Sequence, residues 1–181
     1  PGHLWSQYPN VDAMAVAALA EGARVLRDDA PAAARWQRSA RAVADGWLDA
    51  LVAPSERAAP SPHFGLRVAP DRMTYVWRAG GKPQFFYYQS GHWLHALADL
   101  YALTGEPRYL ERAEAIVRDL CGDNPWRVRL LTELGGVYNW TDDTDGDGLE
   151  DLLKNDLYPE STAFCQIGLQ RLIAARQRRP R

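Results

Sequence analysis

The sequence lacks several features that would assign a protein to a class at once. Its 181 residues include only two cysteines and only two lysines, and the formal net charge is -2. Nucleic-acid binding depends on clustered positive charge, so this composition does not favour such a partner. No apolar run approaches the roughly 20 residues that a membrane-spanning helix needs. We therefore expect neither nucleic acid nor a membrane as a partner.

Neither the cysteines nor the basic residues assign the protein to a functional class. Cys121 and Cys165 can form a single disulfide or remain two free thiols at helix ends. No signal peptide precedes Pro1, so we expect the natural chain to begin further upstream. The basic cluster at residues 176–181 is explained by a solvated terminus. A hydrophobic fraction of 46% is enough for one globular domain over residues 1–181.

Apolar residues recur every three or four positions in five segments, which predicts an all-α fold. The expected helices cover about residues 11–28, 31–51, 83–104, 107–120 and 160–175. Their expected buried stripes are Val11, Met14, Ala18, Val25 and Leu26 in the first; Trp36, Ala40, Val43, Trp47 and Leu51 in the second; Phe86, Trp93, Leu94, Leu97, Leu100 and Tyr101 in the third; Tyr109, Leu110, Ala113, Ile116, Val117 and Leu120 in the fourth; and Phe164, Ile167, Leu172 and Ile173 in the last.

Turn-forming residues mark the expected helix ends. Asn10 suits the N-cap of the first helix, and Pro31 suits the start of the second, so these two helices should form an antiparallel hairpin. Gly105 suits a left-handed C-terminal cap, and Pro107 suits the first turn of the next helix. Gly122 is expected to end that helix.

The connections between the helices differ in character. Residues 53–70 are rich in proline and should be extended, whereas residues 73–77 fit a short strand. Residues 123–159 combine turn formers, aromatics and carboxylates, and so long a connection in a compact domain is usually functional. Tyr138 and Trp140 argue against disorder, because disordered tracts contain few aromatics. We interpret residues 123–159 as a long functional loop.

A series of aspartates at alternate positions within this loop predicts a calcium site. Its aspartates occupy the first, third and fifth positions of a calcium-binding loop, and Gly148 permits the turn. Lys154 stands at the twelfth position, so the pattern is not an EF-hand and instead resembles short Asp-x-Asp-Gly-Asp-Gly repeats of secreted bacterial proteins. A solvated acidic turn is the alternative, but clustered carboxylates repel one another unless a cation screens them. The expected ligands of a structural Ca²⁺ are Asp143, Asp145, Asp147, Leu149 through its carbonyl, and Asp151.

A short motif at the start of the long loop carries a family resemblance. Residues 122–126, Gly-Asp-Asn-Pro-Trp, resemble the Gly-x-Asn-Pro turn of glycoside hydrolase family nine, the inverting cellulases, and residues 103–110 resemble hairpin corners of that fold. The resemblance implies a partial α/α toroid of the six-hairpin type, so we expect either the missing half of the toroid or a second copy of the chain as a partner. It also implies a general acid near the last helix, where Asp156 replaces the family's glutamate. The family's Asp-Ala-Gly-Asp base motif has no counterpart in this sequence.

Inverting hydrolysis of a glycosidic bond needs one carboxylic acid and one carboxylate, about 6.5–9.5 Å apart. Asp156 is the first catalytic candidate and Glu160 is the second. Glu160 also stands where a carboxylate merely complements a helix N-terminus, and Asp123 stands where one caps a turn. Glu133 is undecided between the two kinds of role.

Aromatic side chains on loops can stack on sugar rings, or they can instead fix the loop to the core. His92 and His95 lie three apart on a predicted helix, which can suit a metal, but no third ligand accompanies them and hydrogen bonding is the favoured alternative. The predicted substrate-binding residues are Gln89, His92, Trp126, Tyr138, Trp140 and Tyr158.

Together these patterns favour a secreted or periplasmic protein that acts on a poly- or oligosaccharide as an inverting glycoside hydrolase. One alternative is a helical glycan-binding or scaffold domain without catalysis. Another is a polysaccharide lyase, because that chemistry also occurs on α/α toroids and would rely on Arg127, Arg129 and His92.

Overall fold

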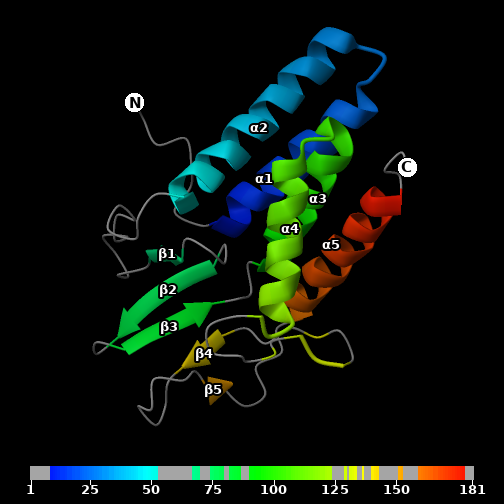
Figure 1. The fold of residues 1–181 in the computed structure, drawn as a ribbon. Helices are drawn as coiled ribbons and strands as arrows, with labels where there is room; N and C mark the ends of the chain where they lie inside the picture. Colours follow the sequence, from blue (N-terminus) through cyan, green and yellow to red (C-terminus); the bar gives the residue numbers. More distant parts are fainter. Residues whose placement is uncertain are drawn as a thin grey trace.

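The structure is a computed structural model, in which two parts of the chain stand out: a set of packed helices and a small sheet (Figure 1). The residues that it describes are 9–52, 67–69, 74–79, 82–86, 90–123, 129, 131–133, 136, 140–142, 151–152 and 159–177. Within them the elements are, in chain order, α1 (Pro9–Val25), α2 (Ala30–Val52), β1 (Arg67–Ala69), β2 (Thr74–Ala79), β3 (Lys82–Phe86), α3 (Ser90–Thr104), α4 (Pro107–Leu120), β4 (Trp140–Asp142), β5 (Asp151–Leu152) and α5 (Pro159–Gln177).

The helices form two layers. Helix α3 packs against α1 and α5, while α2 packs against α1 and α4 packs against α3. The odd-numbered helices therefore make one layer, and α2 and α4 cover it from one side (Figure 1). The odd-numbered helices also run in the same direction, with their N-terminal ends toward the sheet. The predicted antiparallel hairpin of the first two helices is confirmed.

Local backbone chemistry explains most helix ends. The carboxylate of Asp29 accepts a hydrogen bond from the Ala32 amide at 3.1 Å and caps α2. Gly105 ends α3 with φ +71°, and Pro107 opens α4, as predicted. Gly122 follows α4 with φ +102°, and its amide donates to the Asp119 carbonyl at 3.1 Å. The expected boundaries at Gly105, Pro107 and Gly122 are therefore confirmed, whereas α1 ends three residues before the predicted end and α3 begins seven residues after the predicted start.

The prediction that Asn10 caps the first helix is wrong. Helix α1 begins at Pro9, so Asn10 lies inside its first turn. The side-chain oxygen of Asn10 is buried, and no described group donates a hydrogen bond to it. Proline explains the earlier start, because its missing amide hydrogen is tolerated in the first turn of a helix.

The predicted buried face of the first helix is also wrong. Val11, Met14 and Val25 are 49%, 46% and 70% exposed, and Ala18 is exposed as well. Helix α1 instead buries a stripe of small residues, because small side chains allow close approach to α2 and α3. The buried apolar residues of α1 are Ala13, Val16, Ala17, Ala20 and Ala23.

In the last helix, too, the buried face differs from the predicted one. Leu172 is buried as expected, but Ile167 and Ile173 are 39% and 56% exposed. A Cβ added to Gly168 would lie 2.8 Å from the backbone nitrogen of His95, so glycine is what lets α5 approach α3 this closely. The side of α5 that carries Gly168, Cys165 and Leu172 therefore faces the core.

The remaining helices bury most of the predicted residues, but Trp36 and Val43 are only partly buried, and the side chain of Leu51 lies outside the described part of the chain. Helices α2, α3 and α4 enclose the centre of the core, where Trp47 meets Trp93 edge to face with ring centroids 5.7 Å apart. Val117 packs against this core while partly buried. The largest fully buried side chains here are Trp93, Tyr109, Leu94, Leu97, Leu100, Ile116 and Leu120.

The predicted helical class is confirmed by the five helices in the described ranges, but the same ranges also contain a sheet. Its strands follow the order β1-β2-β3-β4-β5, and every neighbouring pair is antiparallel. The strand predicted at residues 73–77 is confirmed as β2. Placing Phe86 in a helix is wrong, because it ends β3, whose aromatic residues pair with β2. The unexpected strands β4 and β5 come from the long connection at residues 123–159.

Candidate functional site

Two of the predicted site residues meet at the sheet end of the helical layer. His92 lies in the first turn of α3, and Glu160 lies in the first turn of α5. The Nε2 atom of His92 is 3.2 Å from Oε1 of Glu160. These two were predicted for different roles, substrate binding and acid catalysis, and the packing of α5 on α3 brings them together.

The two side chains differ sharply in exposure. The His92 side chain is 0% exposed, whereas the Glu160 side chain is 44% exposed. An ionised carboxylate has no hydrogen to donate, so in that state Nε2–H of His92 donates to Glu160. The imidazole is thus a buried support, and the carboxylate is the group that meets solvent.

Phe164 completes this arrangement. Its ring stacks on the His92 imidazole with centroids 3.9 Å apart and an interplanar angle of 26°. Because Phe164 follows Glu160 by one helical turn, the two side chains lie on the same face of α5. The imidazole is therefore held by a ring from one turn of α5 and by a carboxylate from the preceding turn. The sequence marked Phe164 as a core residue, and its spacing from Glu160 is the signal that would have placed it here.

Glu160 also occupies a helix N-terminus. It belongs to the first turn of α5, where the unpaired amides and the helix dipole attract an anion. A partly exposed carboxylate held on one oxygen by a buried imidazole can exchange a proton with a bound molecule. Acid–base chemistry is therefore within reach of this pair.

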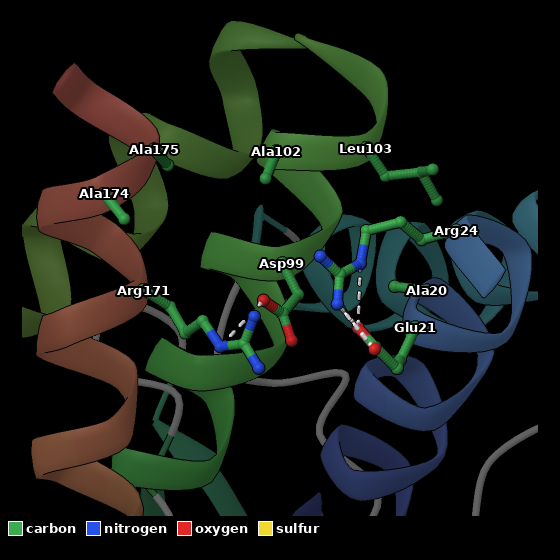
Figure 2. Close-up of a pocket in the computed structure, with 9 residues that line it drawn as sticks. All are labelled: Ala20, Glu21, Arg24, Asp99, Ala102, Leu103, Arg171, Ala174 and Ala175. Atoms are coloured by element: carbon green, nitrogen blue, oxygen red, sulfur yellow. Dashed lines mark hydrogen bonds and ion pairs between the residues drawn. The ribbon is translucent and has the colours of Figure 1, made fainter. Parts of the chain in front are cut away.

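A second histidine and carboxylate pair lies further along the same helices. His95 Nε2 is 3.0 Å from one oxygen of Asp99, and Arg171 Nε is 3.6 Å from the other. Figure 2 shows Asp99 and Arg171 beside Arg24, whose guanidinium binds Glu21, in a cavity of about 60 Å³ between α1, α3 and α5. The hydrogen bonds that the Arg24 guanidinium donates to the Glu21 carboxylate raise the pKa of Arg24 above its usual value. Each charge here already has a partner on a neighbouring or the same helix.

The two histidines serve separate carboxylates. His95 binds Asp99, which bears out the expectation that hydrogen bonding explains it, and His92 binds Glu160. Within the described part of the chain, no group of three or more histidine, cysteine or acidic side chains is arranged to hold a metal ion.

Most of the other predicted site residues lie outside the described residues. For Trp140 and Asp151 the structure gives backbone positions in β4 and β5. Trp140 pairs with Phe86 at the end of β3, and Asp151 pairs with Asp142. The predicted residues outside the described ranges are Gln89, Trp126, Tyr138, Asp143, Asp145, Asp147, Leu149, Asp156 and Tyr158.

The two other acidic candidates in the described ranges, Asp123 and Glu133, are exposed. Asp123 lies three residues after the end of α4, and its amide donates to the Arg118 carbonyl at 2.9 Å. Glu133 is exposed in a turn. Both cysteines are free thiols, with Cys121 exposed and Cys165 buried. Of the two alternatives that the sequence left open, the structure therefore has two thiols and not a disulfide.

Two polar side chains in the first turn of α3, those of Ser90 and Trp93, are buried. Ser90 Oγ and Trp93 Nε1 are buried, and neither has a hydrogen-bond partner among the residues that the structure describes. Their spacing places them on one face of α3, next to the side that carries His92. Their burial depends on how the neighbouring helices pack against α3, which the sequence does not show.

No helix in the described ranges is both long and apolar enough to cross a membrane. Comparison of the sequence with protein-family profiles, with curated proteins and with solved structures finds no match.

Proposed function

We propose that this protein is a carbohydrate-active enzyme that hydrolyses glycosidic bonds, with Glu160 as the carboxyl group that transfers a proton to the leaving oxygen. The observation that carries this proposal is the contact between Glu160 and His92, in which the carboxylate is exposed and the imidazole is buried. Asp156, the first candidate for the acid by sequence, becomes the candidate for the second carboxylate that the inverting mechanism requires.

The difference in exposure between Glu160 and His92 also distinguishes a hydrolase from a lyase, which cleaves by elimination. A lyase needs a base that reaches a proton on the sugar ring, and the His92 side chain is fully buried. Glu160 can reach a bound ligand from its exposed position. The geometry therefore favours a carboxylate-based hydrolase over a histidine-based lyase, and His92 acts as a positioning residue.

The arrangement of helices supports the toroid type. Consecutive helical hairpins place α1, α3 and α5 side by side and leave α2 and α4 on one outer side. An α/α toroid continues this alternation around a closed ring. The N-terminal ends of α3 and α5, which carry the Glu160 pair, then lie at one mouth of the ring, beside the sheet.

Strand pairing supports the calcium loop. Asp142 and Asp151 are partners in the β4–β5 ladder, so the two ends of the acidic segment 143–150 are held together. A closed loop concentrates its carboxylates, and a hard cation such as Ca²⁺ relieves their repulsion. In this proposal Ca²⁺ is structural, and the protein is secreted or periplasmic.

Product analysis distinguishes the three possible activities. The protein is incubated with a neutral polymer, carboxymethylcellulose and polygalacturonate, and both reducing ends and ultraviolet absorbance are followed. New reducing ends without new absorbance are the expected result. Reducing ends with the absorbance of new double bonds identify a lyase and overturn the proposal. Retention on a polymer without either product identifies a binding domain instead.

Substitution at Glu160 tests the assigned residue. Removing a general acid costs about 10²–10⁴-fold in rate, so Glu160→Gln should lose most activity. Glu111→Gln on α4 is the matched control, since it neutralises another exposed glutamate in a helix. His92→Gln should reduce kcat while KM changes little, because His92 orients the acid without touching the substrate. Full activity in Glu160→Gln would exclude Glu160 as the acid.

A further inference from the structure

A small cavity lies where α1, α3 and α5 meet (Figure 2). Its volume is about 60 Å³. One water molecule needs about 10–15 Å³ of such space, so the cavity has room for about four water-sized groups. Alanines form much of its wall, and Ala20, Ala102 and Ala174 leave space that longer side chains would fill. The cavity therefore suits a ligand of a few non-hydrogen atoms.

Two guanidinium groups line this cavity and keep unused hydrogen-bond donors. Arg24 donates to Glu21 from Nε at 3.0 Å and from Nη2 at 2.6 and 2.8 Å. Its third nitrogen, Nη1, has no acceptor among the described residues, and in Figure 2 it points away from Glu21. Arg171 Nε lies 3.6 Å from Asp99, beyond hydrogen-bond distance, and within the described ranges the terminal nitrogens of Arg171 have no acceptor either. Planar donors of this kind bind a carboxylate best.

Two carboxylates balance the charge of the two arginines. Glu21 and Asp99 line the same cavity, so its four ionised side chains are neutral together. A ligand with a single charge would be repelled by the two side chains of its own sign. Glu21 Oε1 accepts one hydrogen bond from Arg24 and can accept another, because a carboxylate oxygen has two acceptor sites. The cavity thus offers unused donors and an unused acceptor site to one ligand.

We propose that this cavity binds a small zwitterion, an α-amino acid of the size of glycine or alanine. The ligand carboxylate accepts hydrogen bonds from Arg24 Nη1 and from the terminal nitrogens of Arg171, and the ligand ammonium donates to Glu21. The Arg24 and Arg171 side chains are 55% and 44% exposed, so a ligand reaches them from solvent. This inference does not depend on the proposed hydrolysis, because the cavity lies beside the C-terminal half of α3 and the Glu160 pair lies at its first turn.

Isothermal titration calorimetry of the 181-residue chain measures the binding of glycine and L-alanine. Saturable binding with a millimolar or tighter Kd is expected for both. Acetate and methylammonium carry one charge each and should bind at least about tenfold more weakly, because each leaves part of the charged cavity unused. L-Leucine exceeds the cavity and should not bind. The proposal is overturned if neither glycine nor L-alanine binds, or if acetate or L-leucine binds as tightly as glycine.

Substitutions at the cavity test the assigned groups. Arg171→Gln should raise the Kd for glycine at least about tenfold, because it removes charge-assisted hydrogen bonds. Ala102→Leu fills the cavity from an exposed position without altering a charge, and it should also prevent binding. Arg176→Gln is the matched control, since Arg176 lies on the same helix as Arg171 but pairs with Glu114. Circular dichroism shows that each variant keeps its helices. Glycine binding by either folded cavity variant at the Kd of the unmodified chain would overturn the proposal.

Discussion

Two carboxylates of the helical layer pair with histidines of α3 in opposite ways. Asp99 is 10% exposed and has both oxygens engaged, one by His95 and one by Arg171. Glu160 is 44% exposed, and within the described residues its partner is His92, through one oxygen. At the first site the carboxylate is enclosed, and at the second the imidazole is enclosed. The same residue types therefore enclose the carboxylate in one place and leave it partly exposed in the other.

The difference follows from where each pair lies on its helix. Asp99 projects from the middle of α3 into the space shared with α1 and α5, where a charge must be compensated within the protein. Glu160 lies in the first turn of α5, at the end of the helix, where its side chain reaches solvent. Position along the helix, more than residue type, decides which carboxylate remains available for chemistry.

Gly168→Ala should disturb both sites, since Gly168 holds α5 against α3 between them. The added Cβ would lie 2.8 Å from the His95 backbone nitrogen, which cannot move as a side chain can. We expect a loss of about 3 kcal/mol in the free energy of unfolding, at the upper end for overpacking. Urea denaturation followed by circular dichroism measures it. An unchanged midpoint would mean that α5 does not approach α3 this closely.

Asp99→Ala should lower the free energy of unfolding more than Glu160→Ala does. The first removes a largely buried acceptor from His95 and Arg171, so it should cost about 2 kcal/mol. The second removes a partly exposed group, so it should change stability by no more than about 0.5 kcal/mol. Equal losses in urea denaturation of the two variants would contradict the contrast between an enclosed and an available carboxylate.

Gly105→Ala isolates the effect of backbone conformation at the corner between α3 and α4. Nothing lies within 4 Å of an added Cβ, so no steric clash opposes the substitution. The backbone angle φ of +71° nevertheless disfavours alanine, and we expect a loss of about 1 kcal/mol. Thermal unfolding should show this loss to be smaller than that of Gly168→Ala. The reverse order would indicate that conformation outweighs packing here.

The sequence predicted the helices well because their signals are local. Periodic apolar residues identified all five, and Gly105, Pro107 and Gly122 end or open helices where expected. These residues act through backbone angles and missing amide hydrogens, which depend little on the rest of the chain. The sheet was less accessible, because β4 and β5 are short and gain their hydrogen bonds only by pairing with distant strands.

The orientation of α1 and α5 could not be predicted from hydrophobicity. Larger apolar side chains such as Met14 and Ile173 gave the stronger pattern, but Ala20 and Gly168 face the core because close packing favours small residues. Of the candidate site, the sequence identified Glu160 and His92 separately, and only the packing of α5 on α3 shows that they touch. A contact between residues 68 positions apart has no local signal.

Cys165 gives the smallest expected effect, a dependence of stability on pH near the Glu160 site. Burial, and then the nearby Cys121, raises the pKa of the Cys165 thiol to about 12. In the unfolded protein the thiol has a pKa of about 8.5, so it loses its proton at a lower pH than in the folded protein. The free energy of unfolding is therefore highest below about pH 8.5 and falls as the pH rises from there toward the pKa of the folded thiol. Between about pH 8 and pH 9 the loss should be roughly 0.7 kcal/mol. Urea denaturation at both values should show a smaller decline for Cys165→Ala than for Cys121→Ala, whose thiol is exposed; equal declines would mean that the folded protein leaves Cys165 open to water.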